Sequence, residues 1–396
     1  MKSKIFYIAL LSILCLKITV AFFIPDVQTW EDYVIAENIL KYGDFFYFND
    51  GTVNHSFQFP VYPVLLSIAL AIYPAPIAGI ILNILLSIIG CLLLKRNLTK
   101  LQKKKWITLS ENNIRLLSLI PLLHPAFLYY ELKNVHPFTH DFMMLNVGIA
   151  TLLYLIDQKS SKPIEAGIFT GLAILGRGTF IVFPFIAIAI LLYQKAYKKI
   201  SLSILGMLLM LAPWVIHNYI SDDIAGLTST NGKILWKGSL HNSEGGNYLL
   251  NGETYYSALS KDELLQIGKF SVKDQNDFFM EKYKNLLKEE PAHVISMFFI
   301  KLKNFWLLSD HIGKNYSEKV NSVWFIYRIF NFVLVMLLVI VLIRSKQSLL
   351  LMLPFIALSI LQCWFYFESR HRLLIEPWLI AILLAGFIKQ KSRSFK

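Results

Sequence analysis

Long apolar runs are the feature that most restricts how this chain can fold. Hydrophobic residues make up 55% of the 396 residues, and charged residues only 16%. A helical run of about 18 or more apolar residues can cross the hydrocarbon core of a bilayer. Backbone groups in lipid must find hydrogen-bond partners within the protein, which favours helices over open sheets. The sequence therefore predicts an all-α integral membrane protein with about ten spans. The predicted spans are 5–24, 76–94, 112–129, 141–156, 163–177, 179–194, 200–219, 322–343, 348–366 and 372–389.

The net charge of +13 does not indicate a nucleic-acid-binding protein. Its clearest basic run, residues 94–106, lies between two apolar segments, where basic residues set membrane topology. The three cysteines Cys15, Cys91 and Cys363 all lie in apolar runs, which favours packed thiols over a disulfide or a metal site. The first apolar run has no small-residue cleavage pattern, so we expect a retained helix and not a signal peptide.

The distribution of basic residues predicts the orientation of the chain. Loops that carry several lysines or arginines tend to face the cytoplasm. The first long loop, residues 25–75, contains a single basic residue, Lys41. We therefore expect both termini in the cytoplasm and loop 25–75 outside. The predicted cytoplasmic segments are the N-terminus, 95–105, 159–162, 195–199, 344–346 and 389–396.

The polar segments divide the chain into three parts. Residues 1–219 are predicted to form an N-terminal membrane module, and residues 321–396 the C-terminal membrane helices. Residues 220–320 form one large outer loop, with turn signals followed by an amphipathic run that suits helices lying on the membrane. Residues 59–74 are apolar but short and flanked by prolines, so we expect a re-entrant or interfacial helix.

Four acids lie close together directly after the first span. Glu31, Asp32 and Glu37 suit the first turns of a helix, where the dipole favours negative charge. Asp26 comes earlier, at the outer end of the first span, where the bilayer edge meets water. A partly desolvated carboxylate there can act as a general base.

Two further polar groups lie between apolar runs. Arg370, His371 and Arg372 lie on the predicted outer side, against the charge bias. Arginine there can bind a phosphate through two parallel hydrogen bonds, or can snorkel or pair with Glu368. Arg177 also lies between two apolar halves, which indicates either a functional charge or a tight helix turn.

The third group, residues 124–142, contains three histidines with Glu131 and Asp141. Their spacing fits no compact metal motif, and a polar cavity lining is the favoured interpretation.

Several motifs in order resemble one family. They are the acidic "PD" loop, "FPVYPVLL", "GLAILGR", "APWVIHNYI", "STNGKILWKG" and "ESRHRLLIEPWLIAILLAG". Together, over nearly the whole chain, they resemble the bacterial branch of the GT-C glycosyltransferases, which are related to protein O-mannosyltransferases and to the lipid A aminoarabinose transferase. No single motif is specific, but their order and spacing are. The resemblance implies a GT-C-type helical bundle in a bacterial cytoplasmic membrane, with its active site on the outer side.

The resemblance also implies an activity: transfer of a sugar, with inversion, from a polyprenyl-phosphate donor to an extracytoplasmic glycolipid, polysaccharide or protein. It gives the role of catalytic base to Asp26, with Glu31 and Asp32 as second candidates. The lipid phosphate would be bound by Arg370, Arg372 and His371, and more weakly by Arg177. A phosphate paired with arginine leaves readily, so we expect no cofactor and no metal. The residues expected to line the acceptor cavity are Tyr62, His136, His140, Asp141, His217, Asn231 and Trp236.

Two departures and two alternatives accompany this resemblance. His217 and Gly178 stand where relatives usually have Arg and Pro. A polymerase or ligase of surface polysaccharide would share the architecture but use a diphosphate-linked donor. A transporter of lipid or sugar would need paired broken helices and charges near the membrane midplane, and the sequence shows neither.

Overall fold

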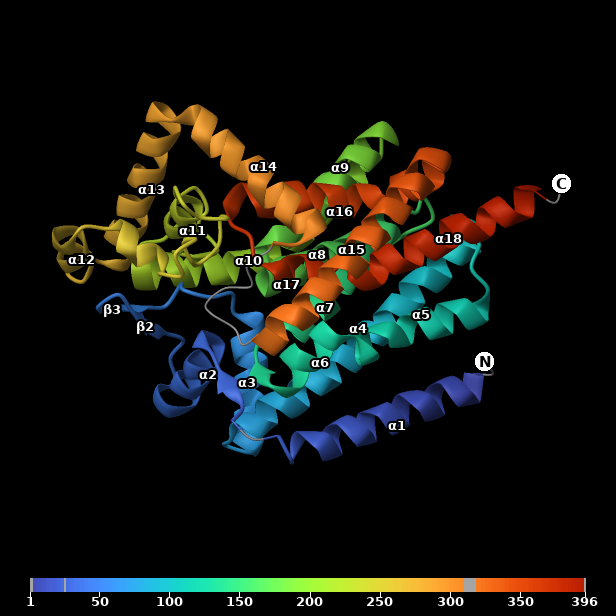
Figure 1. Ribbon diagram of the computed structural model, residues 1–396, viewed down its shortest axis with the longest axis horizontal. Helices are drawn as coiled ribbons and strands as arrows, with labels where there is room; N and C mark the ends of the chain where they lie inside the picture. The colour runs from blue at the N-terminus through green and yellow to red at the C-terminus, as the bar shows by residue number, and fades with distance from the viewer. Residues whose placement is uncertain (1–2, 25, 310–317, 395–396) are drawn as a thin grey trace. The chain divides into compact units, whose positions relative to one another are not determined.

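The computed structural model describes residues 3–24, 26–309 and 318–394 (Figure 1). Lys2, Pro25, residues 310–317 of the predicted outer loop, and Lys396 lie outside the described residues. Helices dominate, as predicted. The elements are α1 (Ser3–Ala21), β1 (Gln28–Thr29), α2 (Glu31–Tyr42), β2 (Tyr47–Asn49), β3 (Thr52–Asn54), α3 (Val61–Ile72), α4 (Pro76–Lys103), α5 (Glu111–Leu123), α6 (Pro125–Leu132), β4 (Asn134–Val135), α7 (Phe138–Leu155), α8 (Pro163–Gly176), η1 (Gly178–Ile181), α9 (Val182–Tyr193), α10 (Tyr197–Asp222), α11 (Asn231–Lys237), η2 (Tyr255–Ala258), α12 (Lys261–Ile267), α13 (Val272–Glu289), α14 (Pro291–Leu307), α15 (Glu318–Arg344), α16 (Lys346–Phe365), α17 (Ser369–Leu373) and α18 (Glu376–Ser394).

Six helices in the described part of the chain are long and apolar enough to cross a membrane: α1, α4, α7, α10, α15 and α16. The helices α3, α8 and α18, and the run of η1 and α9, are apolar but shorter. The predicted span 112–129 is broken into α5 and α6, because His124 and Pro125 end one helix and begin the next. At 12 residues, α3 is about 18 Å long. It is too short to span, in agreement with the prediction for residues 59–74.

The chain divides into two compact units. Unit 1 contains residues 1–47, 58–217 and 377–396, and unit 2 contains residues 48–57 and 218–376. Each unit is described separately below.

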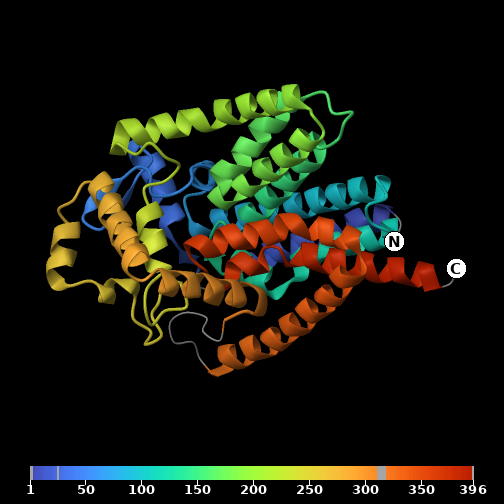
Figure 2. The same ribbon diagram turned by 90° about the horizontal axis from the view of Figure 1, so that it is seen from above.

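Close packing of α8 against α10 holds one side of unit 1 together. Gly167 and Gly171 lie four residues apart on α8, and a Cβ on Gly167 would lie 2.1 Å from the carbonyl oxygen of Ser203. A Cβ on Gly206 would lie equally close to the carbonyl of Ile164. Such spacing of small residues lets membrane helices approach closely. Figure 2 shows α10, in lime, lying along the green α8 and α9.

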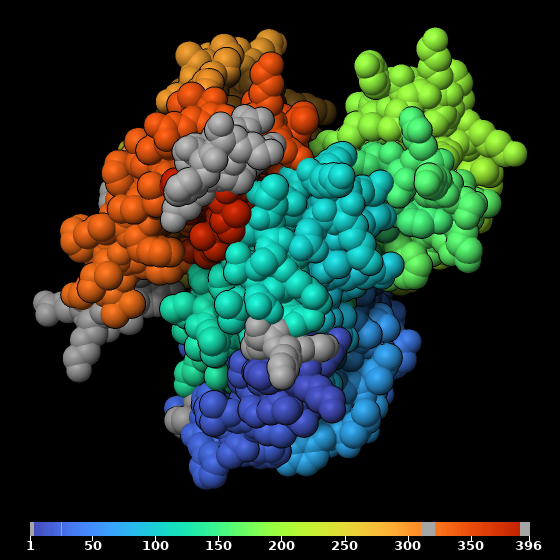
Figure 3. Space-filling view, turned by 90° about the vertical axis from the view of Figure 1, so that its right-hand side faces the viewer, coloured from blue at the N-terminus to red at the C-terminus, as the bar shows by residue number. Residues whose placement is uncertain are grey.

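The basic loops of unit 1 meet at one end of the bundle. Lys104 forms an ion pair of 2.9 Å with Asp157. Lys199 donates to the carbonyl oxygens of Asp157 and Gln158, at 2.8 and 2.9 Å. Figure 3 views this end, with the α4–α5 connection in cyan to teal above the start of α1 in blue. Three of the six segments predicted to be cytoplasmic, the loops that follow α4, α7 and α9, therefore share one end of unit 1.

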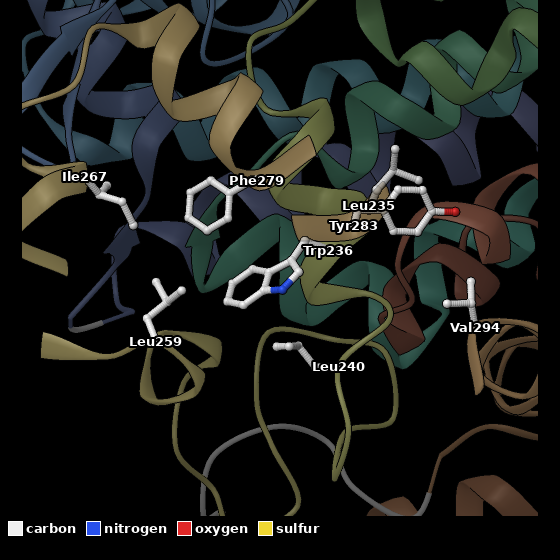
Figure 4. Close-up of a cluster of buried hydrophobic side chains, with 8 residues drawn as sticks. All are labelled: Leu235, Trp236, Leu240, Leu259, Ile267, Phe279, Tyr283 and Val294. Atoms are coloured by element: carbon white, nitrogen blue, oxygen red, sulfur yellow. The ribbon is translucent and has the colours of Figure 1, made fainter. Parts of the chain in front are cut away.

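Unit 2 has an apolar core of its own (Figure 4). Trp236 of α11 lies against Phe279 of α13, with 5.1 Å between ring centroids. The other members of this cluster are Leu235, Leu240, Leu259, Ile267, Tyr283 and Val294. The core joins α11 to the amphipathic α13 and to the start of α14.

The strand pair β2–β3 belongs to unit 2 although it lies within the first long loop of the sequence. Asp222 accepts hydrogen bonds from the backbone N–H groups of His55 and Ser56, at 2.9 and 2.8 Å. The Ser56 hydroxyl also donates to Asp222, at 2.6 Å. The Ser229 N–H donates to the carbonyl oxygen of Ser56, at 2.9 Å. These bonds attach residues 48–57 to the segment that follows α10.

Candidate functional site

Two loops that are far apart in the sequence join at the start of α2. Strand β1 pairs in parallel with β4, with Gln28 opposite Asn134. The indole N–H of Trp30 donates to Asn134 Oδ1 at 3.3 Å. The first loop and the segment 124–142, both predicted to lie outside, are therefore held together in unit 1.

A chain of hydrogen bonds connects this junction to α3 and α4. The Tyr62 hydroxyl donates to Asn83 Oδ1 at 2.9 Å, and Asn83 Nδ2 donates to the carbonyl oxygen of Asn134 at 3.1 Å. Tyr62 and Asn83 are buried, with 2% and 0% of their surfaces exposed. Such fully bonded buried groups fix the positions of the helices that carry them.

Asp141 lies between a cation and an imidazole. One carboxylate oxygen of Asp141 pairs with Arg177, and the other is 3.3 Å from Nδ1 of His140. Asp141 is in the first turn of α7, where the helix dipole favours a negative charge. Arg177 follows the last residue of α8, and its Nε donates to Thr179 at 3.2 Å. The predicted tight turn at Arg177 is present, and the charge of Arg177 is paired with Asp141.

Gly178 permits the backbone at Arg177 to approach the first loop. A Cβ on Gly178 would lie 2.5 Å from the ring of Phe59. This contact gives a physical reason for the glycine that stands where relatives usually have proline.

Asp32 is the acid of the first loop that lies inside this group. It is 5% exposed, in the first turn of α2. Burial raises the pKa of the Tyr62 hydroxyl well above its ordinary value, and the nearby charges of Asp32 and Asp141 raise it further. Tyr62 therefore stays protonated between two carboxylates. The ring of His140 lies 5.5 Å from the Tyr62 ring.

The other two predicted bases lie elsewhere. Asp26 is exposed and lies in a bend two residues before β1, with a left-handed backbone conformation (φ 53°). Glu31 is partly exposed at the first position of α2. Of the three acids, only Asp32 is buried beside Tyr62. Which of the three acids acts as the base stays a prediction.

A buried ion pair in unit 1 connects α1 to α6. Lys17 of α1 pairs with Glu131 of α6 at 2.5 Å, and Ser87 of α4 donates to the same carboxylate at 2.7 Å. Sequence reasoning missed the role of Lys17. The signal was available, because a lysine within an apolar run must find a partner.

Two further predicted cavity residues in unit 1 pack against aromatic rings. His136 is 7% exposed, and its ring lies 5.2 Å from that of Tyr130. His217 stacks on Trp214 at 4.8 Å.

In unit 2, Arg372 is part of a buried network of hydrogen bonds and an ion pair. Its side chain is fully buried, 2.7 Å from Asn331 Oδ1 and 3.4 Å from the carboxylate of Glu376. Glu376 also accepts from Tyr327 at 2.6 Å. These contacts join α15 to α17 and α18, and they give Arg372 a structural role where a phosphate contact was predicted.

Arg370 has a more open setting in unit 2. It pairs with Glu368 at 2.6 Å, and its side chain is 27% exposed. Glu368 accepts from Asn247, which accepts from Lys237 at 2.6 Å. His371 is 4% exposed, and its Nδ1 accepts from the backbone N–H of Glu368 at 3.3 Å. Arg370 therefore remains the predicted phosphate ligand of this segment.

Asn231 and Trp236, the two residues of α11 predicted to line the acceptor cavity, differ in their burial. Asn231 is half-buried, and its side chain donates to the carbonyl oxygen of Thr228 at 3.3 Å. Trp236 is 5% exposed within the apolar core of unit 2 (Figure 4). The indole of Trp236 therefore fills the core of unit 2, and its role in lining an acceptor cavity stays a prediction.

Within the described ranges, no group of three or more His, Cys, Asp or Glu side chains is arranged to hold a metal ion. The five predicted residues that do come together in unit 1 are Asp32, Tyr62, His140, Asp141 and Arg177. Asp141, in this group, and Asp157, among the basic loops, lie at opposite ends of α7.

Comparison with known proteins gives one structural similarity. No protein-family model and no curated protein matches the sequence. The crystal structure of ArnT from Cupriavidus metallidurans bound to undecaprenyl phosphate is similar with a TM-score of 0.45 and 10% sequence identity, covering 99% of this chain and 79% of that chain.

Proposed function

We propose that this protein is a membrane glycosyltransferase of the GT-C type. It would move a sugar from a polyprenyl-phosphate donor to an extracytoplasmic acceptor, with inversion at the anomeric carbon. The observation that carries the proposal is the group formed by Asp32, Tyr62, Asp141 and Arg177, at the end of unit 1 away from the basic loops. That end is the predicted outer side.

The position of the group suits a lipid-linked donor. The prenyl chain keeps the sugar at the level of the head groups, so catalytic side chains must lie at a membrane boundary. Asp141 is at the first turn of a candidate membrane span, and Arg177 directly follows a shorter apolar helix. Both charges therefore lie near the end of an apolar segment, where phosphate and sugar would be found.

Asp32 is proposed as the base. The acceptor hydroxyl attacks the anomeric carbon, and its proton passes to the Asp32 carboxylate. The new C–O bond forms while the bond between the anomeric carbon and the phosphate oxygen breaks. A carboxylate nearby also stabilises the oxocarbenium-like transition state.

Arg177 is proposed to stabilise the leaving polyprenyl phosphate, since a guanidinium matches phosphate oxygens in geometry and charge. Asp141 holds Arg177 in place and is counted as its positioning residue. Arg370 remains a second predicted phosphate ligand. No metal is part of this proposal.

The test compares three purified proteins in lipid: wild type, Asp32→Asn and Asp26→Asn. Each receives a panel of polyprenyl-phosphate sugars with a membrane glycolipid extract, and release of polyprenyl phosphate is followed. We expect a loss of at least about 100-fold in Asp32→Asn and a small change in Asp26→Asn.

The reverse order of effects would return the role of base to Asp26. Turnover of diphosphate-linked donors alone would favour the polymerase or ligase. Absence of turnover with every donor would reject the transferase proposal.

A further inference from the structure

His140 contains a buried nitrogen atom that the described chain does not satisfy. The residue is fully buried, and within the described ranges its Nε2 atom has no hydrogen-bond partner. The neighbouring Thr139 is also fully buried, and its hydroxyl has no hydrogen-bond partner within the described ranges. Buried polar atoms are nearly always paired, so two exceptions on one helical turn call for a partner that the described residues do not supply.

The hydrogen bonding of the other ring nitrogen defines what Nε2 can do. Nδ1 lies 3.3 Å from Oδ1 of Asp141, and the second oxygen of Asp141 is paired with Arg177. A carboxylate that is paired with arginine accepts hydrogen bonds and does not donate them, so Nδ1 is the nitrogen that donates. In the neutral imidazole, Nε2 then carries a lone pair and accepts. It suits an O–H or N–H donor, and it repels phosphate or carboxylate oxygens, which are acceptors as well.

The surroundings of Nε2 exclude one obvious partner. The Tyr62 hydroxyl, on the ring nearest to His140, already donates to Asn83. On the other side is Gly176, where an added Cβ would lie 2.9 Å from Cε1 and 3.3 Å from Nε2 of His140. Glycine at this position therefore lets the end of α8 lie against the imidazole of His140 without a side chain of its own.

We propose that Nε2 of His140 accepts a hydrogen bond from a hydroxyl group of the carbohydrate bound at this site. The inference rests on the proposed function and adds a binding residue to it. The hydroxyl could belong to the donor sugar or to the acceptor, because both offer the same O–H group. His140 touches substrate in this proposal but takes no proton from it.

Two matched variants separate the two ring nitrogens. His140→Asn retains an amide N–H near the position of Nδ1, which can still donate to Asp141, and lacks any atom at Nε2. His140→Gln reaches further and can place its carbonyl oxygen near the position of Nε2. Neither change alters Asp141, Arg177 or Asp32.

The experiment measures the unfolding temperature of each protein in lipid nanodiscs against the concentration of three probes: polyprenyl phosphate, polyprenyl-phosphate mannose and octyl glucoside. Polyprenyl phosphate has no sugar hydroxyl and should act equally on all three proteins. The midpoint is the probe concentration that gives half of the full rise in unfolding temperature. If the hydroxyl comes from the donor, this concentration of polyprenyl-phosphate mannose should be about tenfold higher for His140→Asn than for wild type, and should return toward the wild-type value in His140→Gln. If it comes from the acceptor, octyl glucoside should show this pattern instead.

The outcomes distinguish this inference from the proposed function. Equal midpoints for wild type and His140→Asn with every probe that binds would overturn the role of His140 and leave the transferase in place. If polyprenyl phosphate binds but neither sugar probe stabilises wild type, both the role of His140 and the transfer of a sugar are rejected. The variants' own unfolding temperatures, without probe, show whether they fold.

Discussion

Arg177 in unit 1 and Arg372 in unit 2 look alike in the sequence but differ in the structure. Each lies next to an apolar helix, and each pairs with a carboxylate, Asp141 for one and Glu376 for the other. The side chain of Arg372 is fully buried, whereas that of Arg177 is 18% exposed. Arg372 contacts Asn331 and Glu376 within unit 2, whereas Arg177 is partly exposed.

This difference separates a structural charge from a candidate catalytic one. A fully buried ion pair is costly to desolvate and even more costly to break, so it fixes the packing of the helices that carry it. The partly exposed Arg177, at the end of an apolar helix, is the arginine proposed to bind an anionic ligand. The following predictions use this contrast.

Removal of Glu376 should have the largest effect. Glu376→Ala leaves the guanidinium of Arg372 buried without its carboxylate, which should cost about 3–5 kcal/mol of stability. The measurement is the free energy of unfolding in detergent or lipid. The matched control is the double variant Arg372→Met with Glu376→Leu, which removes both charges and should cost less. A single variant as stable as wild type would refute the structural role of Arg372.

Lys301 gives the next largest effect, because it is a buried cation whose hydrogen-bond partners among the described residues are carbonyl oxygens. It lies in α14, outside the candidate spans, and donates to the carbonyl oxygens of Phe365 and Trp364 at 2.9 and 3.4 Å. Burial lowers the pKa of Lys301 from 10.5 to about 8. Between these pH values the unfolded chain binds more protons than the folded one, so stability should rise with pH.

The test of Lys301 is the difference in unfolding free energy between wild type and Lys301→Met from pH 7 to 10.5. The difference should shift in favour of wild type by up to about 3 kcal/mol, mostly above pH 8. A difference that does not change with pH would show that Lys301 has an ordinary pKa. Lys303, which is exposed on the same helix, provides the control substitution.

The sequence was sufficient to predict the class of fold and most of the helices. Apolar runs are a local signal that survives without tertiary information, so α4, α7, α10, α15 and α16 lie where predicted. The break at His124 was missed because proline inside an apolar run can also be tolerated in a membrane helix.

The site was predicted only in part, because its geometry depends on contacts distant in sequence. Asp141 and Arg177 were both singled out, but nothing local indicated that they pair. The choice between Asp26 and Asp32 depended on which acid the packing of α2 against α3 buries. Trp236 lies in the apolar core of unit 2, and an aromatic residue that fills a core and one that lines a cavity have the same sequence signal.

Arg177→Lys should separate function from stability. Lysine keeps the charge but loses the planar fork that can hold both Asp141 and a phosphate. We expect transferase activity to fall about tenfold, with the unfolding temperature nearly unchanged. Arg372→Lys is the matched substitution in unit 2, and it should lower the unfolding temperature. The contrast between the two arginines fails if both substitutions act in the same way.

The ion pair of Lys104 and Asp157 should have the smallest effect, since both side chains are about 30% exposed. Water screens such a pair, so Lys104→Ala should cost less than about 1 kcal/mol of stability, and less still at high salt. The hydrogen bond from Lys104 lowers the pKa of Asp157 below 3.8. A group with a lowered pKa stabilises the fold above its unfolded value and loses this contribution as the pH falls through its folded value. The difference between wild type and Lys104→Ala should therefore be constant near neutral pH and disappear only below about pH 4. A larger cost, or one that resists salt, would mean that this end of unit 1 depends on the pair in the way that unit 2 depends on Arg372 and Glu376.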